Sequence, residues 1–230
     1  MLHPETLTPG KEAGYPGGFS YYVAGRGGVL GDVDAAVVVS AFAFFAPALV
    51  RSLWESGIAV EGARAAGDRY ALACADWGRR RLDEFAQIPQ AAERLAELLA
   101  KIVDQVDPSG LALFAGWQAQ ARVEDAHGRC YQLLHVLREL RGSVHIVAIV
   151  AHGLTPLEAL LANPGSHGAE QAKRFGWDGQ FPDPVEWRET FHHAEELTNA
   201  LMARHLDVLN PTEQAELVAL VTKVGSIISR

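Results

Sequence analysis

The chain has 230 residues, with 28 acidic residues against 20 lysines and arginines, and 49% of it is hydrophobic. This length predicts one domain, or one domain with a small appendage, whose core needs no disulfide or metal for stability. A net charge of -8 disfavours broad contact with nucleic-acid phosphates or anionic lipid. Cys74 and Cys130 are too far apart in the sequence to suggest a disulfide framework or a zinc site, so we expect buried free thiols.

The N-terminal segment, residues 1–31, is rich in glycine and proline and predicts an irregular, turn-rich start to the fold. It shows no basic stretch followed by an apolar run, so we see no signal peptide and expect a cytoplasmic protein. Its glycine-rich part, residues 24–31, lacks GxGxxG spacing and a preceding strand, and Asp32 and Asp34 would repel an anion. Close helix packing or a tight turn is therefore expected there, not a phosphate site.

Apolar residues at helical spacing predict helices along the rest of the chain, and no strand. Residues 32–56 predict one buried helix, kinked near Pro47, whose apolar part is too short to span a membrane. Asn210 followed by Pro211 and Glu213 predicts a capping box at the start of the last helix. Further helices are expected at residues 62–85, 89–106, 111–121, 124–152, 157–161, 170–175, 184–205 and 211–228.

The most informative of these helices is the one predicted from Glu124, because it carries two unlike faces. One face is wholly apolar and must pack on a core. The other carries a polar stripe at a seven-residue spacing, close to two helical turns. The stripe consists of Tyr131, Arg138, His145 and His152, with His135 and Arg141 beside it.

Two interpretations of the stripe stay open. In the first, Arg138 and Arg141 pair with Glu139, Glu124 or a carboxylate of another helix, and His145 bonds a backbone carbonyl. In the second, the stripe points into a pocket for a small ligand. Arginine offers a fixed fork of donors for a carboxylate or phosphate, and histidine donates or accepts a proton near neutral pH. Tyr22 and Arg26 would then lie at the mouth of that pocket.

A metal site is not expected on this helix. Two ligands on one helix reach a single ion when they are three or four residues apart, whereas His145 and His152 are seven residues apart, about 10 Å along the axis. No activated nucleophile is visible either, and the sequence identifies no cofactor.

Two segments show a resemblance to a known family: YYVAGRGGVLGDVDAAVVVSAFAFFAPALV and HVLRELRGSVHIVAIVAHGLTPLEALL. Both resemble the SalK-like bacterial family, whose members are helical, mostly uncharacterised and labelled helix-turn-helix proteins. In that family the second segment usually has a glycine before the histidine, whereas Val144 precedes His145 here. The resemblance implies an all-α protein in two parts: a helical bundle over residues 1–162 and a degenerate winged-helix-like tail over residues 163–230, with Trp177 and Trp187 as landmarks.

The family label suggests DNA binding, but the charge of the tail opposes it. Residues 165–230 hold six lysines and arginines against ten acidic residues, and glutamates outnumber arginines in the helix at the recognition position, residues 184–205. Such a helix would repel a duplex. We expect this tail to assist formation of a homodimer instead.

The sequence thus predicts an all-α, cytoplasmic protein that binds a small organic ligand, for which the arginines would suit an anion. The expected site residues are Tyr131, Arg138, Arg141, His145, His152, Tyr22 and Arg26. No contact with nucleic acid or membrane is expected. Two alternatives stay open: an enzyme that uses His145 as general base, which needs a carboxylate or tyrosine partner, and a transcriptional regulator of the helix-turn-helix type.

Overall fold

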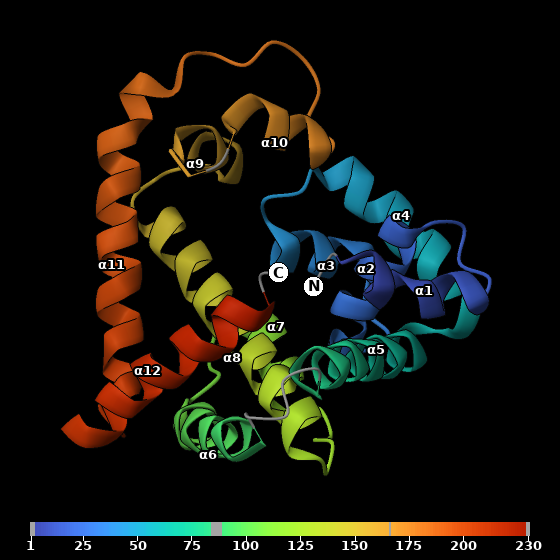
Figure 1. Ribbon diagram of the computed structural model, residues 1–230. Helices are drawn as coiled ribbons and strands as arrows, with labels where there is room; N and C mark the ends of the chain where they lie inside the picture. Colours follow the sequence, from blue (N-terminus) through green and yellow to red (C-terminus); the bar gives the residue numbers. More distant parts are fainter. Residues whose placement is uncertain (1–2, 84–88, 166, 229–230) are drawn as a thin grey trace.

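A computed structural model describes residues 3–83, 89–165 and 167–228 of the chain, and these residues form twelve α-helices, two short 3-10 helices and no strand (Figure 1). The predicted all-α fold is confirmed. The elements are α1 (Pro4–Glu12), α2 (Gly18–Gly27), η1 (Gly28–Leu30), α3 (Ala35–Phe42), α4 (Pro47–Glu61), α5 (Ala63–Asp83), α6 (Pro89–Gln105), α7 (Ala112–Gln118), α8 (Ala126–Ala151), α9 (Pro156–Ala162), α10 (Gly168–Arg174), η2 (Pro184–Trp187), α11 (Arg188–Leu206) and α12 (Pro211–Ile228).

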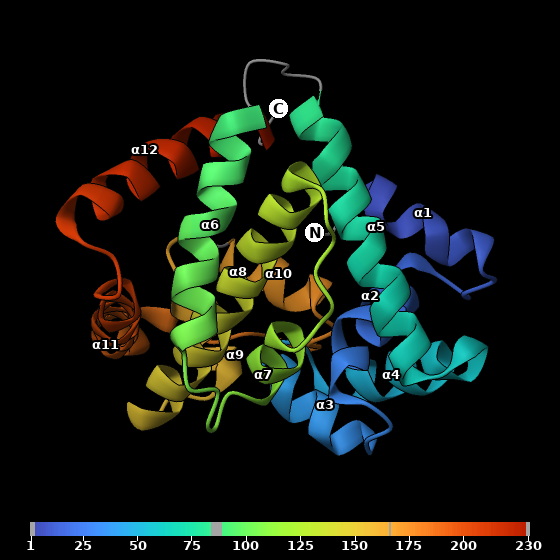
Figure 2. The same ribbon diagram turned by 90° about the horizontal axis from the view of Figure 1, so that it is seen from below.

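Helix α8 is the central element, as its apolar face requires. It lies between α5 and α6 and also contacts α7 and α11 (Figure 2). The Asp125 carboxylate caps its N-terminus by accepting from the Gly128 N–H at 2.7 Å. Leu133, Leu140 and Ala148 are fully buried, so α8 contributes to three apolar clusters in turn along its length.

The N-terminal segment differs from its prediction: residues 4–30 form α1, α2 and η1, not an irregular start. Their local helix propensity is low, but Tyr21, Val23 and Ala24 are fully buried in the largest cluster, and this packing outweighs propensity. Close approach of neighbouring helices explains why this segment contains glycines. A Cβ on Gly28 would lie 2.2 Å from the Ala63 carbonyl oxygen, so the predicted close packing is confirmed.

The helix predicted over residues 32–56 is also different, because it is broken into α3 and α4 rather than kinked. Ala43 takes a left-handed backbone with φ 42°, and Pro47, which has no N–H to donate, begins α4. The Ala46 N–H instead donates to the Phe175 carbonyl at 2.8 Å. Sequence reasoning missed this break because its cause is a contact with a distant segment.

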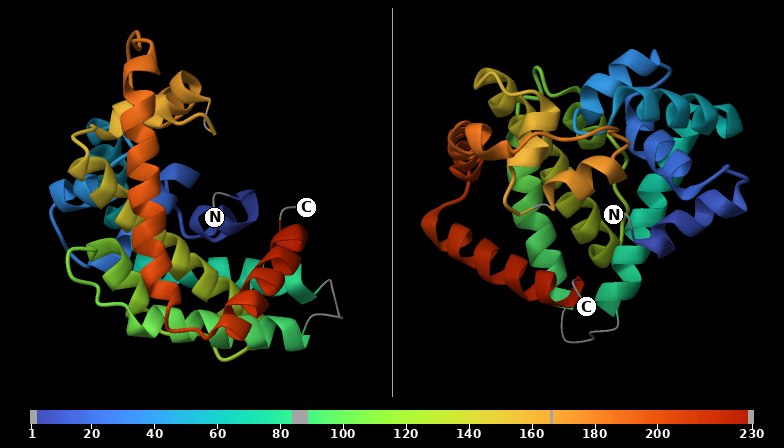
Figure 3. Two further views of the ribbon diagram at one scale, coloured as in Figure 1. Left: turned by 90° about the vertical axis from the view of Figure 1, so that its left-hand side faces the viewer. Right: turned by 90° about the horizontal axis from the view of Figure 1, so that it is seen from above.

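The tail contains α10, η2, α11 and α12, and the described part of it has no strand and therefore no wing. A long loop, residues 175–183, connects α10 to η2 and α11 across the top of Figure 1. Helix α11 then packs along α8, and α12 turns back toward α6 and α5 (Figure 3). The predicted capping box is confirmed: the Asn210 side chain accepts from the Glu213 N–H at 3.0 Å, and Glu213 accepts from the Asn210 N–H.

The division at residue 162 stays a prediction, as does the homodimer. The apolar face that suggested a dimer packs largely within the chain, since Leu217 and Val224 are buried in a cluster with α6. Val218 and Val221 remain exposed on α12.

Within the described ranges, no single helix is long and apolar enough to cross a membrane; α8 and α9 taken together meet that criterion of length and composition, but they join at a bend of 103°. Cys74 and Cys130 are buried free thiols, as predicted, and burial raises their pKa values to about 11 and about 12.

Candidate functional site

A pocket of about 290 Å³ lies where α2, α3, α7 and α8 meet the chain that follows α10. We call it the basic pocket. The break between α3 and α4 places Phe44 and Phe45 beside Phe42 in the lining, while α2 supplies Arg26 and α8 supplies two further arginines and the histidine. Its lining residues are Tyr22, Arg26, Ala41, Phe42, Phe44, Phe45, Leu113, Arg138, Arg141, Gly142, Ser143, His145, Ile146 and Phe175.

One wall of the basic pocket is aromatic. The Phe45 and Phe175 rings stack with centroids 4.1 Å apart, and the Tyr22 ring meets Phe42 and Phe45, each at 6.1 Å. Trp177 fixes the loop that carries Phe175, because its indole N–H donates to the Phe44 carbonyl at 2.8 Å. This wall suits a flat or hydrocarbon ligand.

An inner ion-pair group, Arg26, Glu139 and Arg138, lies at the base of the pocket. Arg26 donates to both carboxylate oxygens of Glu139, at 3.0 and 2.8 Å, and Arg138 donates to Glu139 Oε1 at 2.7 Å. The Glu139 side chain is only 1% exposed, so the two-point bond to Arg26 fixes α2 against α8. The Arg26 guanidinium also lies 4.5 Å from the centre of the Phe42 ring.

The charges in this inner group shift one another's pKa values. Burial raises the pKa of Glu139, but the charge of Arg26 and its hydrogen bonds outweigh burial and lower that pKa to about 2. Burial lowers the pKa of Arg26, and the opposite charge of Glu139 more than reverses this, so the guanidinium stays ionised. Both groups are therefore charged at neutral pH.

Arg138 differs from Arg26 in its exposure. Its side chain is 54% exposed, and only its Nη1 bonds Glu139; Nε and Nη2 make no hydrogen bond within the described chain. Those N–H groups remain available to a ligand or to water.

An outer ion-pair group, Arg141, Glu195 and His145, joins α8 to α11. Glu195 accepts from Arg141 Nη2 at 2.8 Å, and its other oxygen lies 3.3 Å from His145 Nδ1. The same Nδ1 lies 3.0 Å from the Thr198 hydroxyl. Burial lowers the pKa of His145 below its ordinary value, and the Glu195 charge opposes that effect only in part.

Taken together, the guanidinium groups of the pocket and their ion-pair partners carry a surplus of positive charge. Three arginines, Arg26, Arg138 and Arg141, face two carboxylates, Glu139 and Glu195. Arg138 and Arg141 are both about half-exposed (54% and 47%), and each uses only one guanidinium nitrogen in its ion pair. The arrangement can therefore take up one anionic group next to an aromatic wall.

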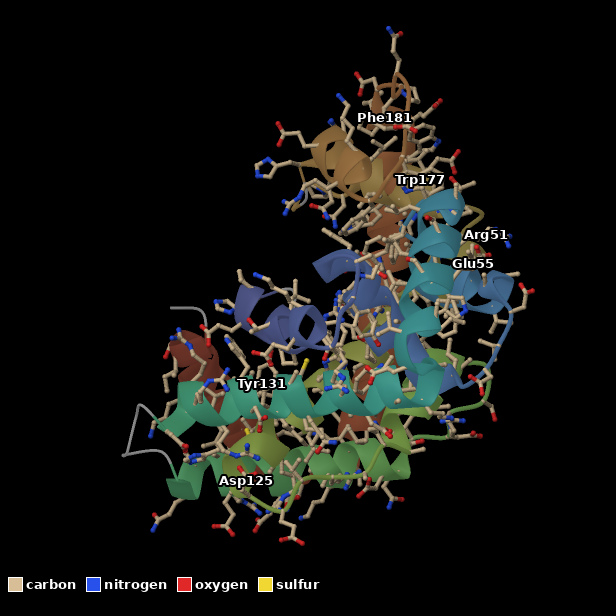
Figure 4. The ribbon with its side chains drawn as sticks, turned by 90° about the vertical axis from the view of Figure 1, so that its right-hand side faces the viewer. Arg51, Glu55, Asp125, Tyr131, Trp177 and Phe181 are labelled. Atoms are coloured by element: carbon tan, nitrogen blue, oxygen red, sulfur yellow. The ribbon has the colours of Figure 1, made fainter. Side chains whose placement is uncertain are left out.

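Five of the seven predicted site residues line this one pocket: Tyr22, Arg26, Arg138, Arg141 and His145. Tyr131 and His152, at the two ends of the stripe, do not. The Tyr131 ring is buried against Trp77, with centroids 5.1 Å apart, far from Trp177 and Phe181 (Figure 4). His152 is the C-cap of α8 and bonds the Ala148 carbonyl at 2.8 Å.

The rise of the helix explains why the ends of the stripe lie outside the pocket. At about 1.5 Å per residue, the three repeats from Tyr131 to His152 span about 30 Å along α8. The pocket reaches only the middle of this span, so Arg138 and His145 line it and the two end residues have other neighbours.

The contacts of the polar stripe agree in part with both interpretations given for it from the sequence. Arg138 pairs with Glu139 and Arg141 pairs with a carboxylate of another helix, as the structural interpretation expected. His145 bonds a threonine hydroxyl and not a backbone carbonyl. The same residues nevertheless line a pocket, as the ligand-binding interpretation requires.

Several residues of the site were missed by sequence reasoning. Glu195 and Thr198 lie on α11, and no local pattern connects them to His145. Phe44, Phe45 and Phe175 were missed because only the break after α3 turns the first two inward, and the third comes from beyond α10. Glu139 was not missed, because the sequence analysis named it as a possible partner of Arg138, next to it in the sequence.

In the described part of the chain, no group of three or more His, Cys, Asp or Glu side chains could hold a metal ion.

Comparison with known proteins gives one match. A family described as a helix-turn-helix family matches residues 1–184, which includes every residue of the basic pocket and ends before α11. No curated protein and no solved structure matches the chain.

Proposed function

This chain belongs to a helix-turn-helix family, and we propose that it binds a small organic anion in the basic pocket. One observation carries the proposal: the half-exposed Arg138 guanidinium keeps N–H donors unused beside an aromatic wall, in a site with surplus positive charge. A carboxylate would bond Arg138, and an apolar or aromatic body would pack on Phe45 and Phe175. The two resembling segments support the finer assignment to the SalK-like bacterial group.

Calorimetric titration with phenylacetate and with the neutral phenylacetamide tests this proposal. We expect wild-type protein to bind phenylacetate more tightly than the amide, because only the acid carries a charge for Arg138. Arg138→Gln should weaken phenylacetate binding by about tenfold or more, the effect of losing one charge-assisted hydrogen bond.

Arg80→Gln is the matched control. Arg80 is 56% exposed and has a single carboxylate partner, Glu5, but it lies on α5 away from the pocket. The control should bind phenylacetate as wild type does. Equal binding of acid and amide, or equal effects of the two substitutions, would contradict an anion site at Arg138.

Transcriptional regulation is a second candidate, and the family match favours it. The match ends at residue 184, so α11, the helix we expected at the recognition position, lies beyond it. The acidic tail disfavours contact with a duplex. Titration of a labelled DNA duplex at low salt distinguishes the two candidate functions. We expect no binding. Binding that weakens steeply with salt would favour a transcriptional regulator whose effector binds in the basic pocket.

Catalysis is a further candidate that one contact favours. A general base at His145 needs a carboxylate partner, and Glu195 lies 3.3 Å from Nδ1. Native mass spectrometry of untagged protein would first identify the natural ligand. A turnover assay would then test whether the protein converts that ligand, for example an ester or a hydroxy acid.

A further inference from the structure

His145 has hydrogen-bond neighbours that determine which ring nitrogen carries its proton. The Thr198 hydroxyl donates its single hydrogen to the Ala194 carbonyl at 2.7 Å. It therefore has no hydrogen left for His145 Nδ1, 3.0 Å away, and must accept from it. The Glu195 carboxylate, 3.3 Å from the same nitrogen, also only accepts. Both neighbours thus require a proton on Nδ1.

The other ring nitrogen, Nε2, is left without a proton in the neutral ring. Burial lowers the pKa of His145, which favours that neutral form at pH 7. Nε2 makes no hydrogen bond to a described residue, and it is not sealed in protein as both ring nitrogens of His135 are. His145 lines the basic pocket, and its Nδ1 is bound to α11.

We propose that His145 presents an unprotonated Nε2 to the basic pocket as a hydrogen-bond acceptor, and that the ligand therefore carries a hydroxyl or N–H donor in addition to its anionic group. This inference rests on the proposed function and narrows its ligand class. Thr198 is a positioning residue in this arrangement, because it acts on the ligand only through His145.

The spacing of Arg138 and His145 places the two ligand groups apart. The two residues are seven positions apart on α8, about 10 Å along the helix axis. The aromatic wall lines the same pocket. An aromatic acid whose donor is at the end opposite its carboxylate fits both groups, and para-hydroxyphenylacetate is such a probe.

The state of the ring is measured first, without any ligand. Long-range proton–nitrogen correlation NMR of isotope-labelled protein at about pH 7.5, above the ordinary histidine pKa, distinguishes the two tautomers. Signals absent from His145→Asn assign the ring. We expect a protonated Nδ1 and a bare Nε2, and a mixture of the two tautomers in the double variant Thr198→Val with Glu195→Ala, which removes both acceptors. A ring protonated on Nε2 would overturn the inference.

Binding of matched probes is measured second. Wild-type protein should bind para-hydroxyphenylacetate about tenfold more tightly than phenylacetate, the effect of one hydrogen bond. Para-methoxyphenylacetate has no hydrogen-bond donor at that position, so it should bind no more tightly than phenylacetate. His145→Asn keeps an N–H near Thr198 and Glu195 but has no counterpart of Nε2, so its affinities for para-hydroxyphenylacetate and phenylacetate should become equal, whatever its affinity for phenylacetate.

The outcomes separate this inference from the proposed function. If phenylacetate binds through Arg138 but the hydroxyl adds nothing, the inference fails and the anion site stands. If neither acid binds while NMR finds the proton on Nδ1, the proposed function fails for aromatic acids. The inferred ligand, an anion with an additional donor group, is then rejected as well, but the protonation state assigned to His145 holds. A preference for the hydroxyl that survives in His145→Asn would place the acceptor elsewhere and overturn the inference.

Discussion

The two ion-pair groups on α8 use the same chemistry at very different depths. In the inner group, Glu139 is 1% exposed and is bound at two points by Arg26 from α2. In the outer group, Glu195 is 28% exposed and holds Arg141 by one bond from α11. A buried pair is costly to break because the remaining charge stays in protein, whereas water replaces a lost partner at an exposed pair. The Arg26–Glu139 pair should therefore stabilise the fold far more than the Arg141–Glu195 pair does.

The largest expected effect comes from breaking the inner group. Glu139→Ala leaves the Arg26 charge buried without its carboxylate, so we expect the free energy of unfolding to fall by about 3–5 kcal/mol. Urea denaturation followed by circular dichroism measures it. Glu195→Ala is the matched change in the outer group and should cost under about 1 kcal/mol. Equal losses of unfolding free energy in the two variants would show that the burial of an ion pair does not determine the cost of breaking it here.

A double substitution sharpens the same test. In Arg26→Met with Glu139→Leu, both charges are removed together, and most of the stability lost in Glu139→Ala should return. If the double variant is as unstable as Glu139→Ala, then the shape of this region, and not an unpaired charge, accounts for the loss.

A second effect, of intermediate size, concerns His135 beside the inner group. Burial lowers its pKa to about 3, against the opposing charge of Glu139, whereas the unfolded chain titrates near 6.5. Below about pH 6.5 the unfolded state takes up a proton that the folded state refuses, so stability falls as pH falls, by up to about 1.4 kcal/mol per pH unit. His135→Leu should flatten this slope between about pH 6.5 and 5, as measured by urea denaturation at each pH.

His145→Asn is the comparison for that slope. His145 has two hydrogen-bond neighbours, and its side chain is 11% exposed against 2% for His135, so burial penalises its charged form less. Its removal should flatten the slope less than removal of His135 does. The reverse order would show that the outer histidine is the more tightly enclosed of the two.

The smallest expected effect is that of the outer group's charge on binding at Arg138, and it rests on the proposed anion site. Glu195→Gln removes one of the two carboxylates that offset the charge of the pocket's arginines, so the affinity for phenylacetate should rise by about threefold to tenfold in a calorimetric titration. An affinity that falls would mean that Glu195 positions the site and does not compete for it.

The sequence by itself determined the class of fold and the packing of one face of α8 on the core. Apolar residues at helical spacing have few ways to be buried other than as packed helices, and the capping box at Asn210 depends on residues three apart. The same periodicity placed Arg138, Arg141 and His145 on one side of α8, where they line one pocket. Local patterns suffice for features that neighbouring residues create.

Only the tertiary structure decided what faces that side of α8. The Ala46 N–H at the break between α3 and α4 bonds the Phe175 carbonyl, and the partners of Arg26 and His145 lie on helices distant in the sequence. Tyr131 and His152 lie outside the site because the stripe extends about 30 Å along α8. A pocket is formed by several elements at once, and the pattern of one helix holds no information about the side chains that the others bring to it.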